Sequence, residues 1–255
     1  MKIHKTSIIH PSAKIDQDVE IDQFCIIDEN AEIGKGCHLY PYVHIMKNSI
    51  IGKNNIIHQG AIIGGLPQDL KFNGENTKVV IGDNNIIREH VTINRGTKLV
   101  GKTIVGNNCL LMAYVHIAHD CIVDDKIILA NGVQLAGHVE IGYHVTIGGI
   151  TGIHQFCKVG EHSFVGACRV ILHDVPPFIL ATGEPLQYSG INTVGLRRRK
   201  FSLNTRNKIK NAYKILYSPN HNVSQAVKEI ETTIDNSKEI KSILDFIKKS
   251  DRGII

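Results

Sequence analysis

A strict period of six residues runs through the first two thirds of the chain. Stepping in sixes from Ile3, eleven consecutive positions up to Ile63 are aliphatic. Isoleucine, leucine and valine make up 74 of the 255 residues, so chance would give such a run roughly once in a million trials. The same phase resumes at Ile81 and continues to Ile171, with Leu99 among its members. Neither an α-helix nor a regular strand has this period, so the repeat decides the fold prediction.

A second register lies four residues after each repeat position and holds mostly small or β-branched side chains, such as Val19, Cys25 and Val133. Two short strands joined by a turn explain a period of six, and three hexads close one triangular coil. Glycine, asparagine and aspartate in the corners suit the positive φ of tight turns. The pattern therefore predicts a mainly β fold, a parallel solenoid with the repeat residues stacked in its interior.

The repeat is interrupted by one loop and is followed by helical spacing. Residues 64–78 put Asp69 and Glu75 where aliphatic residues are required, and the retained phase indicates an extruded segment. From Ser202, a plausible helix cap, apolar residues recur at helical intervals. We expect a β-helical domain over 1–190 and a helical domain over 191–255 that covers the open strand edges. The expected apolar helix positions are Ile209, Ala212, Tyr213 and Leu216; Val223, Val227, Ile230 and Ile234; and Ile240, Ile243, Leu244 and Ile247.

Composition and cysteine placement exclude several classes of protein. No run approaches 18 apolar residues and no secretory leader is evident, so we expect a cytoplasmic protein without a transmembrane segment. Five of the six cysteines occupy the small register and only Cys168 does not, which favours inert core thiols over disulfides. The net charge is +5 and the densest basic run is 197–200. That run suits phosphates or an acidic protein, whereas nucleic acid is disfavoured because no recognised binding module accompanies it.

Three histidines are expected near one corner on successive coils. His119, His138 and His154 follow repeat positions that are 18 residues apart, and Asp120 comes directly after His119. An imidazole can accept a proton near neutral pH, and a nearby carboxylate orients it and stabilises its charged form. The first hypothesis is therefore a general base acting on a hydroxyl group.

Two other functions remain open on the residues alone. A three-histidine zinc site, as in hexapeptide-repeat carbonic anhydrases, would use His116 and His119 together with a histidine of another subunit. Such a site leaves the 64–78 loop and the basic run without a role. A non-catalytic hexapeptide scaffold is the other alternative, and the HIAHDC segment argues against it.

Several motifs together are more specific than the repeat. They are HQGAIIG with PQDLKF, IREHVTINRGT, HIAHDC, LAGHVEIG, IHQFCKVG, DVPPF, GLRRRKFS and the terminal DRGII. Over nearly the whole chain these segments resemble the UDP-N-acetylglucosamine O-acyltransferases that begin lipid A synthesis. The resemblance implies a homotrimer of left-handed β-helices with active sites between subunits, transferring a 3-hydroxyacyl chain from acyl carrier protein to the glucosamine 3-position.

The resemblance also implies residue roles. His119 would be the general base, Asp120 its support, and the Gly137 backbone N–H the oxyanion donor. No metal or organic cofactor is implied, because the thioester donor is already activated. The other implied binding residues are Gln68, Asp69, Lys71, His116, His138, His154 and Gln155 around the substrates, Asn192 and Arg199 on the nucleotide side, and Arg198 near the phosphopantetheine.

Two positions depart from the pattern of the family. Val194 stands where many members have glutamate, so we expect one nucleotide hydrogen bond to be lost. Gly166-Ala167 stands where many have Gly-Gly, so the Ala167 methyl group should shorten the preferred acyl chain. The sequence leaves open whether the acceptor carries a 3-hydroxyl or a 3-amino group.

Overall fold

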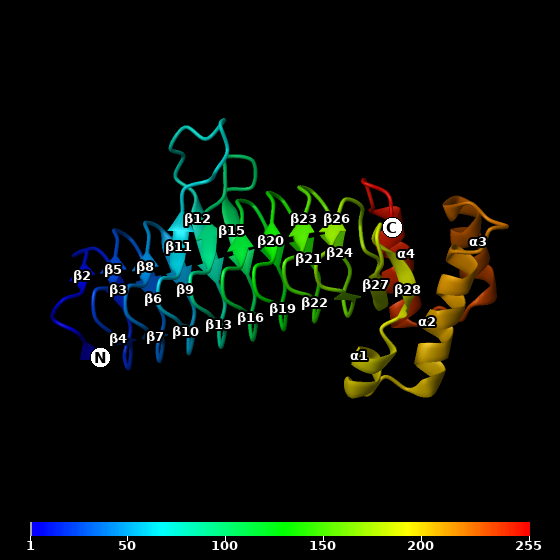
Figure 1. Cartoon of the computed structure of the whole chain (residues 1–255), viewed down its shortest axis with the longest axis horizontal. Helices are drawn as coiled ribbons and strands as arrows, with labels where there is room; N and C mark the ends of the chain where they lie inside the picture. The colour runs from blue at the N-terminus through cyan, green and yellow to red at the C-terminus, as the bar shows by residue number, and fades with distance from the viewer. Residues whose placement is uncertain (1) are drawn as a thin grey trace.

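The computed structural model describes residues 2–255, so Met1, with which the expected first domain begins, lies outside the described residues. A long prism of stacked coils carries helices at its C-terminal end (Figure 1). Each coil gives a short strand to each of three sheets, here named sheets A, B and C. Within the prism all the pairings between coils are parallel, as the six-residue repeat predicts.

The elements have the following bounds. Sheet A comprises β1 (Lys2–Ile3), β4 (Glu20–Ile21), β7 (His38–Leu39), β10 (Ile56–Ile57), β13 (Ile86–Ile87), β16 (Leu110–Leu111), β19 (Ile128–Leu129), β22 (Thr146–Ile147), β25 (Phe164–Val165), β27 (Ile179–Thr182) and β28 (Gln187–Ile191). Sheet B comprises β2 (Ile8–Ile9), β5 (Ile26–Ile27), β8 (His44–Ile45), β11 (Ile62–Gly65), β14 (Thr92–Asn94), β17 (His116–Ile117), β20 (Gln134–Leu135), β23 (Gly152–Ile153) and β26 (Val170–Ile171). Sheet C comprises β3 (Lys14–Ile15), β6 (Glu32–Ile33), β9 (Ser49–Ile51), β12 (Lys78–Ile81), β15 (Lys102–Val105), β18 (Ile122–Val123), β21 (Glu140–Ile141) and β24 (Lys158–Val159). The helices are α1 (Thr193–Arg198), α2 (Leu203–Leu216), α3 (Val223–Thr233) and α4 (Lys238–Lys248).

The repeat residues fill the interior. Ile27, Ile63 and Leu135 are at most 1% exposed, and burying each such side chain contributes about 1.5–3 kcal/mol. The second register packs beside them, and its five cysteines are buried and free while Cys168 is exposed, as expected. Consecutive coils pair 18 residues apart, so His116 on β17 lies beside Gln134 on β20. The repeat thus sets both the core and the vertical alignment of side chains outside it.

Leu99 is not a repeat position, which corrects the sequence prediction. It is 74% exposed and lies between β14 and β15. Across this segment the partners on β12 and β15, such as Lys78 and Lys102, are 24 residues apart instead of 18. Six additional residues are therefore accommodated in a second extruded loop, 95–101. Because the insertion equals one repeat, it leaves the phase unchanged and cannot be seen from the period.

The corners adopt positive φ with a wider range of residues than expected. Besides glycine and asparagine, the left-handed conformation occurs at aromatic residues, histidines and even Ile150, with φ of 55°. A β-branched residue is disfavoured there, so the stacked coils on either side must impose the conformation. Asp120 and His138 are both corner residues of this kind, with φ of 61°.

The C-terminal segment agrees largely with the sequence prediction. Ser202 accepts the N-cap hydrogen bond of α2, and the buried residues of α2 and α4 are the predicted ones. In α3 the predicted Ile230 is buried, but Val223 is 44% exposed and Ala226, which was not predicted, is buried. The antiparallel pair β27–β28 and the short α1 were not anticipated. The expected boundary at residue 190 falls within β28, and the division into two domains stays a prediction.

Among residues 2–255, no helix has the length and apolar character needed to cross a membrane.

Candidate active site

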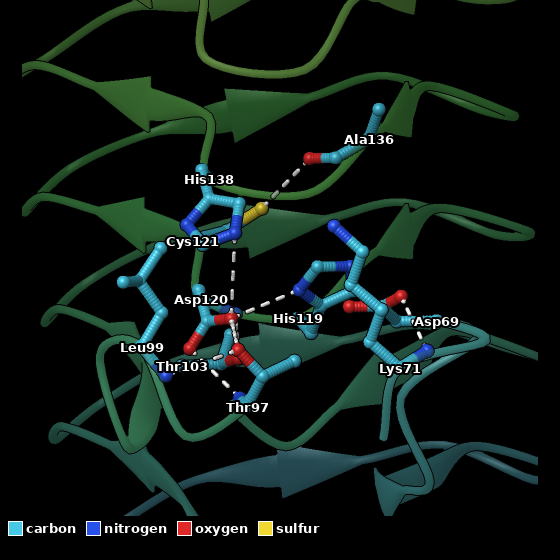
Figure 2. A network of polar contacts seen from close by, with 10 residues as sticks. All are labelled: Asp69, Lys71, Thr97, Leu99, Thr103, His119, Asp120, Cys121, Ala136 and His138. Atoms are coloured by element: carbon cyan, nitrogen blue, oxygen red, sulfur yellow. Dashed lines mark hydrogen bonds and ion pairs between the residues drawn. The ribbon is translucent and has the colours of Figure 1, made fainter.

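The corner between sheets B and C gathers the predicted catalytic side chains. Asp120 and His138 occupy the same corner position on successive coils, and His119 immediately precedes the first of them. Figure 2 shows both imidazoles directed toward the carboxylate of Asp120. The corner lies directly after β17 and β20, so the hexad spacing of the chain brings these groups together.

His119 and Asp120 form a histidine–carboxylate pair. Nδ1 of His119 lies 2.9 Å from Oδ2 of Asp120, whose side chain is completely buried. A carboxylate can only accept a hydrogen bond, so Nδ1 carries the proton and Nε2 carries the lone pair of the neutral ring. The His119 side chain is 15% exposed, which leaves the ring accessible to a ligand while its orientation is fixed.

The buried carboxylate is held by two threonines that the sequence analysis missed. Oδ1 of Asp120 accepts from the Thr97 N–H at 2.9 Å, and Oδ2 accepts from the Thr97 hydroxyl at 2.6 Å. The Asp120 N–H in turn donates to the Thr103 hydroxyl at 2.9 Å. Both threonines stand in the small register, four residues after positions 93 and 99. Two successive polar residues in that register could have indicated these contacts. The signal was hidden because Leu99 falls in phase with the six-residue repeat by chance.

Gly137 lies over the imidazole of His119. A Cβ atom at this position would come within 2.6 Å of Cε1 and 2.7 Å of Nε2 of His119, so any side chain here would displace the ring. Among residues 2–255 no hydrogen-bond acceptor is found for the Gly137 N–H. A backbone donor therefore remains available beside the nitrogen that carries the lone pair.

The neighbouring histidines are held in the neutral form. Burial lowers the pKa of His116, with a further contribution from His119, and the Nδ1 of His116 is 2.7 Å from the Thr92 hydroxyl. Burial also lowers the pKa of His138, although Asp120 opposes the shift. The His138 ring stacks on Phe156 at 4.5 Å, which fixes its plane. These side chains add polar atoms to the site without adding charge.

A groove of about 520 Å³ runs from His119 along sheet B. His119 and Gly137 line one part of it, and Ile153, Val170 and Leu172 give another part an apolar lining. Of the other predicted residues, four line this groove: Gln68, His116, His154 and Gln155.

The 64–78 loop stands at the His119 end of this groove. Asp69 and Lys71 lie beside the His119–Asp120 pair in Figure 2, and Asp69 is close enough to raise the pKa of His138 against the effect of burial. The Asp69 carboxylate accepts from the Lys71 N–H at 3.0 Å. The extruded loop therefore contributes Gln68 to the groove and places an acid and a base beside the His119–Asp120 pair.

His119, Asp120 and His138 also form a possible metal-binding group. Their ligand atoms lie within 4.8 Å of one another. This donor set differs from the one that the sequence suggested, because His138 and Asp120 take the place of His116. Both oxygens of Asp120 already accept hydrogen bonds from Thr97. The arrangement is therefore that of a hydrogen-bonded dyad, and metal dependence is a separate experimental question.

The predicted residues Asn192, Arg198 and Arg199 line a second groove on sheet A. It has a volume of about 990 Å³ and lies between the prism, β28 and α1. Arg198, Arg199 and Lys210 line it, and among residues 2–255 no aspartate or glutamate does so. Three cations without an acid make this groove complementary to phosphate groups. Val194 also lines the groove and is 50% exposed.

Asn192 lines the second groove and is held in place by His162 behind it. Asn192 caps α1 by accepting from the Gly195 N–H, and its amide donates to the His162 carbonyl. The Arg199 guanidinium lies 3.2 Å from Nδ1 of His162 and donates to the His162 carbonyl. His162 thus supports the arginine that the groove presents.

The neutral state of His162 should be visible in the pH dependence of stability. Burial, aided by Arg199, His144, Lys238 and Lys126, lowers the pKa of His162 to about 3. The unfolded chain therefore binds a proton that the folded chain does not bind between about pH 6.5 and pH 3. Stability contributed by the neutral ring is complete above this window and is lost as the pH falls through it.

We expect His162→Asn, which keeps an acceptor for Arg199, to flatten the acid side of the stability profile. The wild-type slope should exceed that of the variant by about 1.4 kcal/mol per pH unit near pH 5, the value for one proton. Urea unfolding at several pH values measures both slopes. Parallel profiles would show that His162 does not titrate as proposed.

Ala167 lies outside the linings of both grooves. It is exposed on the corner between sheets A and B, and the Gly148 Cα on the coil below packs closely against its backbone. Its expected effect on acyl length therefore depends on a neighbouring subunit and stays a prediction.

A hexapeptide β-helix with a histidine–carboxylate dyad in a surface groove defines a transferase of the hexapeptide class. Sequence comparison agrees: the profile described as bacterial transferase hexapeptide matches residues 30–65 and 102–137. The profile described as UDP-N-acetylglucosamine O-acyltransferase, domain 2, matches residues 174–255.

Full-length relatives identify the family. The chain is 43% identical to the acyl-[acyl-carrier-protein]–UDP-N-acetylglucosamine O-acyltransferase of Thiobacillus denitrificans, covering 76% of this chain and 75% of that protein. It is 46% identical to the corresponding enzyme of Aliivibrio salmonicida, over 76% and 74% of the two chains. The crystal structure of LpxA, a UDP-N-acetylglucosamine acyltransferase from Bacteroides fragilis, is 46% identical, with a TM-score of 0.98 over 99% of both chains. The chain belongs to the UDP-N-acetylglucosamine O-acyltransferase family.

This membership confirms the predicted fold class, a left-handed parallel β-helix followed by a C-terminal helical part. The left-handed winding is an exception to the usual right-handed crossover between parallel strands.

Proposed function

We propose that the chain is an acyl-[acyl-carrier-protein]–UDP-N-acetylglucosamine O-acyltransferase, which catalyses the first step of lipid A synthesis. The relatives reported above are named as acyl-[acyl-carrier-protein]–UDP-N-acetylglucosamine O-acyltransferases. The observation that supports it best is the His119–Asp120 dyad, because its free Nε2 faces a groove that combines a polar end with an apolar lining. A hydroxyl acceptor and an acyl donor both fit such a groove.

The geometry supports the following mechanism. Nε2 of His119 takes the proton from the glucosamine 3-hydroxyl while the oxygen attacks the thioester carbonyl. The Asp120 carboxylate stabilises the imidazolium that forms, and the Gly137 N–H donates to the oxyanion of the tetrahedral intermediate. Collapse of the intermediate breaks the carbon–sulfur bond, and the imidazolium returns its proton to the departing phosphopantetheine thiolate.

The two grooves divide the predicted substrate contacts between two faces of one chain. Residues of the reaction centre lie on sheet B, whereas the cations suited to the nucleotide phosphates lie on sheet A. One complete site therefore requires sheet B of one subunit to face sheet A of another. A homotrimer around the corner between these sheets closes this heterologous contact into a ring.

The distribution of exposed apolar side chains supports this assembly. Among the large apolar residues of the described strands that are exposed, only Ile122 lies on sheet C. The corner between sheets A and B carries four exposed apolar side chains: Phe24, Tyr42, Tyr114 and Ile150. Apolar surface concentrated on two faces and their common corner is typical of a subunit interface.

The apolar lining of the first groove suits the 3-hydroxyacyl chain of the carrier protein. Gly152 provides space beside His154, and Val170 and Leu172 continue the apolar surface toward the C-terminal end. The sugar would then occupy the His119 end, below Asp69 and Lys71.

We expect Ala167→Gly to shift the preferred donor to a longer acyl chain. In the trimer the exposed Ala167 would face the neighbour's groove, and removing its methyl group lengthens the space by about one methylene. This is worth about 0.8 kcal/mol, or roughly four-fold in kcat/KM between donors that differ by one methylene. Carrier proteins bearing a series of 3-hydroxyacyl lengths measure the preference. An unchanged preference would show that Ala167 does not limit the chain.

Thioester turnover with UDP-N-acetylglucosamine, in the presence and absence of a chelator, tests the function and its metal-dependent alternative together. We expect carrier thiol release that depends on the sugar nucleotide and persists in the chelator. Loss of turnover restored by zinc would instead assign His119, Asp120 and His138 to a metal site. Binding of the nucleotide without any turnover would favour a scaffold.

A further inference from the structure

The extruded loop 95–101 makes contacts that the stacking of the repeats does not require. A β-helix can continue without insertions, and the phase on either side of this loop is unbroken. The loop nevertheless turns inward at Thr97, whose side chain is only 8% exposed. Its neighbours Lys98, Leu99 and Val100 are exposed. Arg95 and Thr97 of the loop are both buried, and Thr97 is the one whose side chain contacts Asp120 at the catalytic corner.

Thr97 contacts both oxygens of the Asp120 carboxylate. Its N–H donates to Oδ1 at 2.9 Å and its hydroxyl donates to Oδ2 at 2.6 Å, as the dashed lines of Figure 2 show. Oδ2 is also the oxygen that receives Nδ1–H of His119. No lysine or arginine pairs with Asp120 among residues 2–255. The threonine therefore supplies two of the hydrogen bonds that a buried carboxylate needs, and these bonds fix the orientation of both oxygens.

We propose that Thr97 is a positioning residue that acts through Asp120 and keeps the Oδ2 of its carboxylate aimed at Nδ1 of His119. Thr103 supports the same arrangement from the next strand by accepting the Asp120 N–H. The extruded loop thus delivers a hydroxyl to the catalytic carboxylate. This inference rests on the proposed function, in which His119 is the base.

The proposal predicts a specific change in the pH profile. In Thr97→Val, Oδ2 has one donor fewer, so it stabilises the protonated imidazole of His119 more strongly. The acidic limb of kcat/KM should move to higher pH, and kcat/KM should fall about ten-fold, a typical loss when a hydrogen bond supporting a functional group is removed. The other titratable groups facing the pair are His116, His138, Asp69 and Lys71, and the substitution leaves them unchanged.

Conservative and matched variants separate positioning from packing. Thr97→Ser keeps the hydroxyl, so it should have the wild-type kcat/KM and the wild-type acidic limb of the pH profile. Thr151→Val is the matched control, because Thr151 is completely buried and its hydroxyl has two backbone contacts at another corner. That variant should lower the melting temperature without moving the limb.

A double-mutant comparison completes the experiment. In an Asp120→Asn background Thr97→Val should have little further effect, because the two residues act on His119 as a unit. Thr97→Ala removes the same hydroxyl and replaces Thr97→Val if valine prevents folding. The proposal is overturned if the variant that lacks the hydroxyl keeps the wild-type pH profile and kcat/KM. It is also overturned if Thr97→Ser is as impaired as that variant. The third contradicting result is a loss on Thr97→Val that is as large in the Asp120→Asn background as in the wild type. Full activity of His119→Ala would instead refute the proposed base itself.

Discussion

Replacement of His119 by alanine should lower kcat about 100- to 10,000-fold, the range that a positioned general base contributes. The reason is the free Nε2, which lies beside the unpaired Gly137 N–H and is the nitrogen suited to take the proton of the acceptor hydroxyl. The nucleotide should bind with nearly unchanged affinity, because the cations of the second groove remain. Steady-state turnover and calorimetric binding of UDP-N-acetylglucosamine measure the two quantities.

The control for this prediction is the melting temperature and the oligomeric state of His119→Ala. The ring is 15% exposed and its removal leaves the repeat core untouched, so both should stay close to the wild-type values. A variant that is folded and fully active would refute the assignment of the base. If the folded variant has lost nucleotide binding, the role of His119 is substrate recognition and not proton transfer.

Two inactive variants should restore activity when they assemble together. The reaction centre lies on sheet B and the cationic groove on sheet A, so His119→Ala and the double variant Arg198→Ala/Arg199→Ala damage different halves of each site. In a trimer that contains both variants, one of the three sites combines two intact halves from neighbouring subunits. Co-expression with two affinity tags and purification of mixed oligomers should therefore give about a third of the wild-type activity.

Pairing His119→Ala with Asp120→Asn provides the matched control, because both changes fall in the first groove and no mixed site is intact. The same background activity in both mixtures would contradict a site shared between subunits. It would mean that each chain holds a complete site by itself.

The fold was largely predictable because the residues that recur every six positions are the ones that form the core. Each coil needs an aliphatic residue such as Ile117 or Leu135 at the same place, so the period survives in the sequence. Leu99 shows where this reasoning fails, since an insertion of one full hexad preserves the phase. The hairpin β27–β28 was missed for another reason: its antiparallel pairing follows no period of six.

The candidate site was predictable in part. The vertical alignment of His119 and His138 follows from the coil length, and Asp120 is adjacent in sequence. The support from Thr97 could not be predicted in the same way, because it depends on how an extruded loop folds back onto the corner. Nor does the repeat indicate that Asn192 uses two of its polar groups to cap α1 and hold His162.

The most direct test of the central claim is the structure of the product. Purified protein would be incubated with a 3-hydroxyacyl carrier protein and UDP-N-acetylglucosamine, and the acylated nucleotide characterised by mass spectrometry and two-dimensional NMR. We predict an ester on the glucosamine 3-oxygen, formed in equal amount to the carrier thiol released and absent with His119→Ala. Hydrolysis of the thioester without an acylated nucleotide, or acylation only of a 3-amino analogue, would contradict this function.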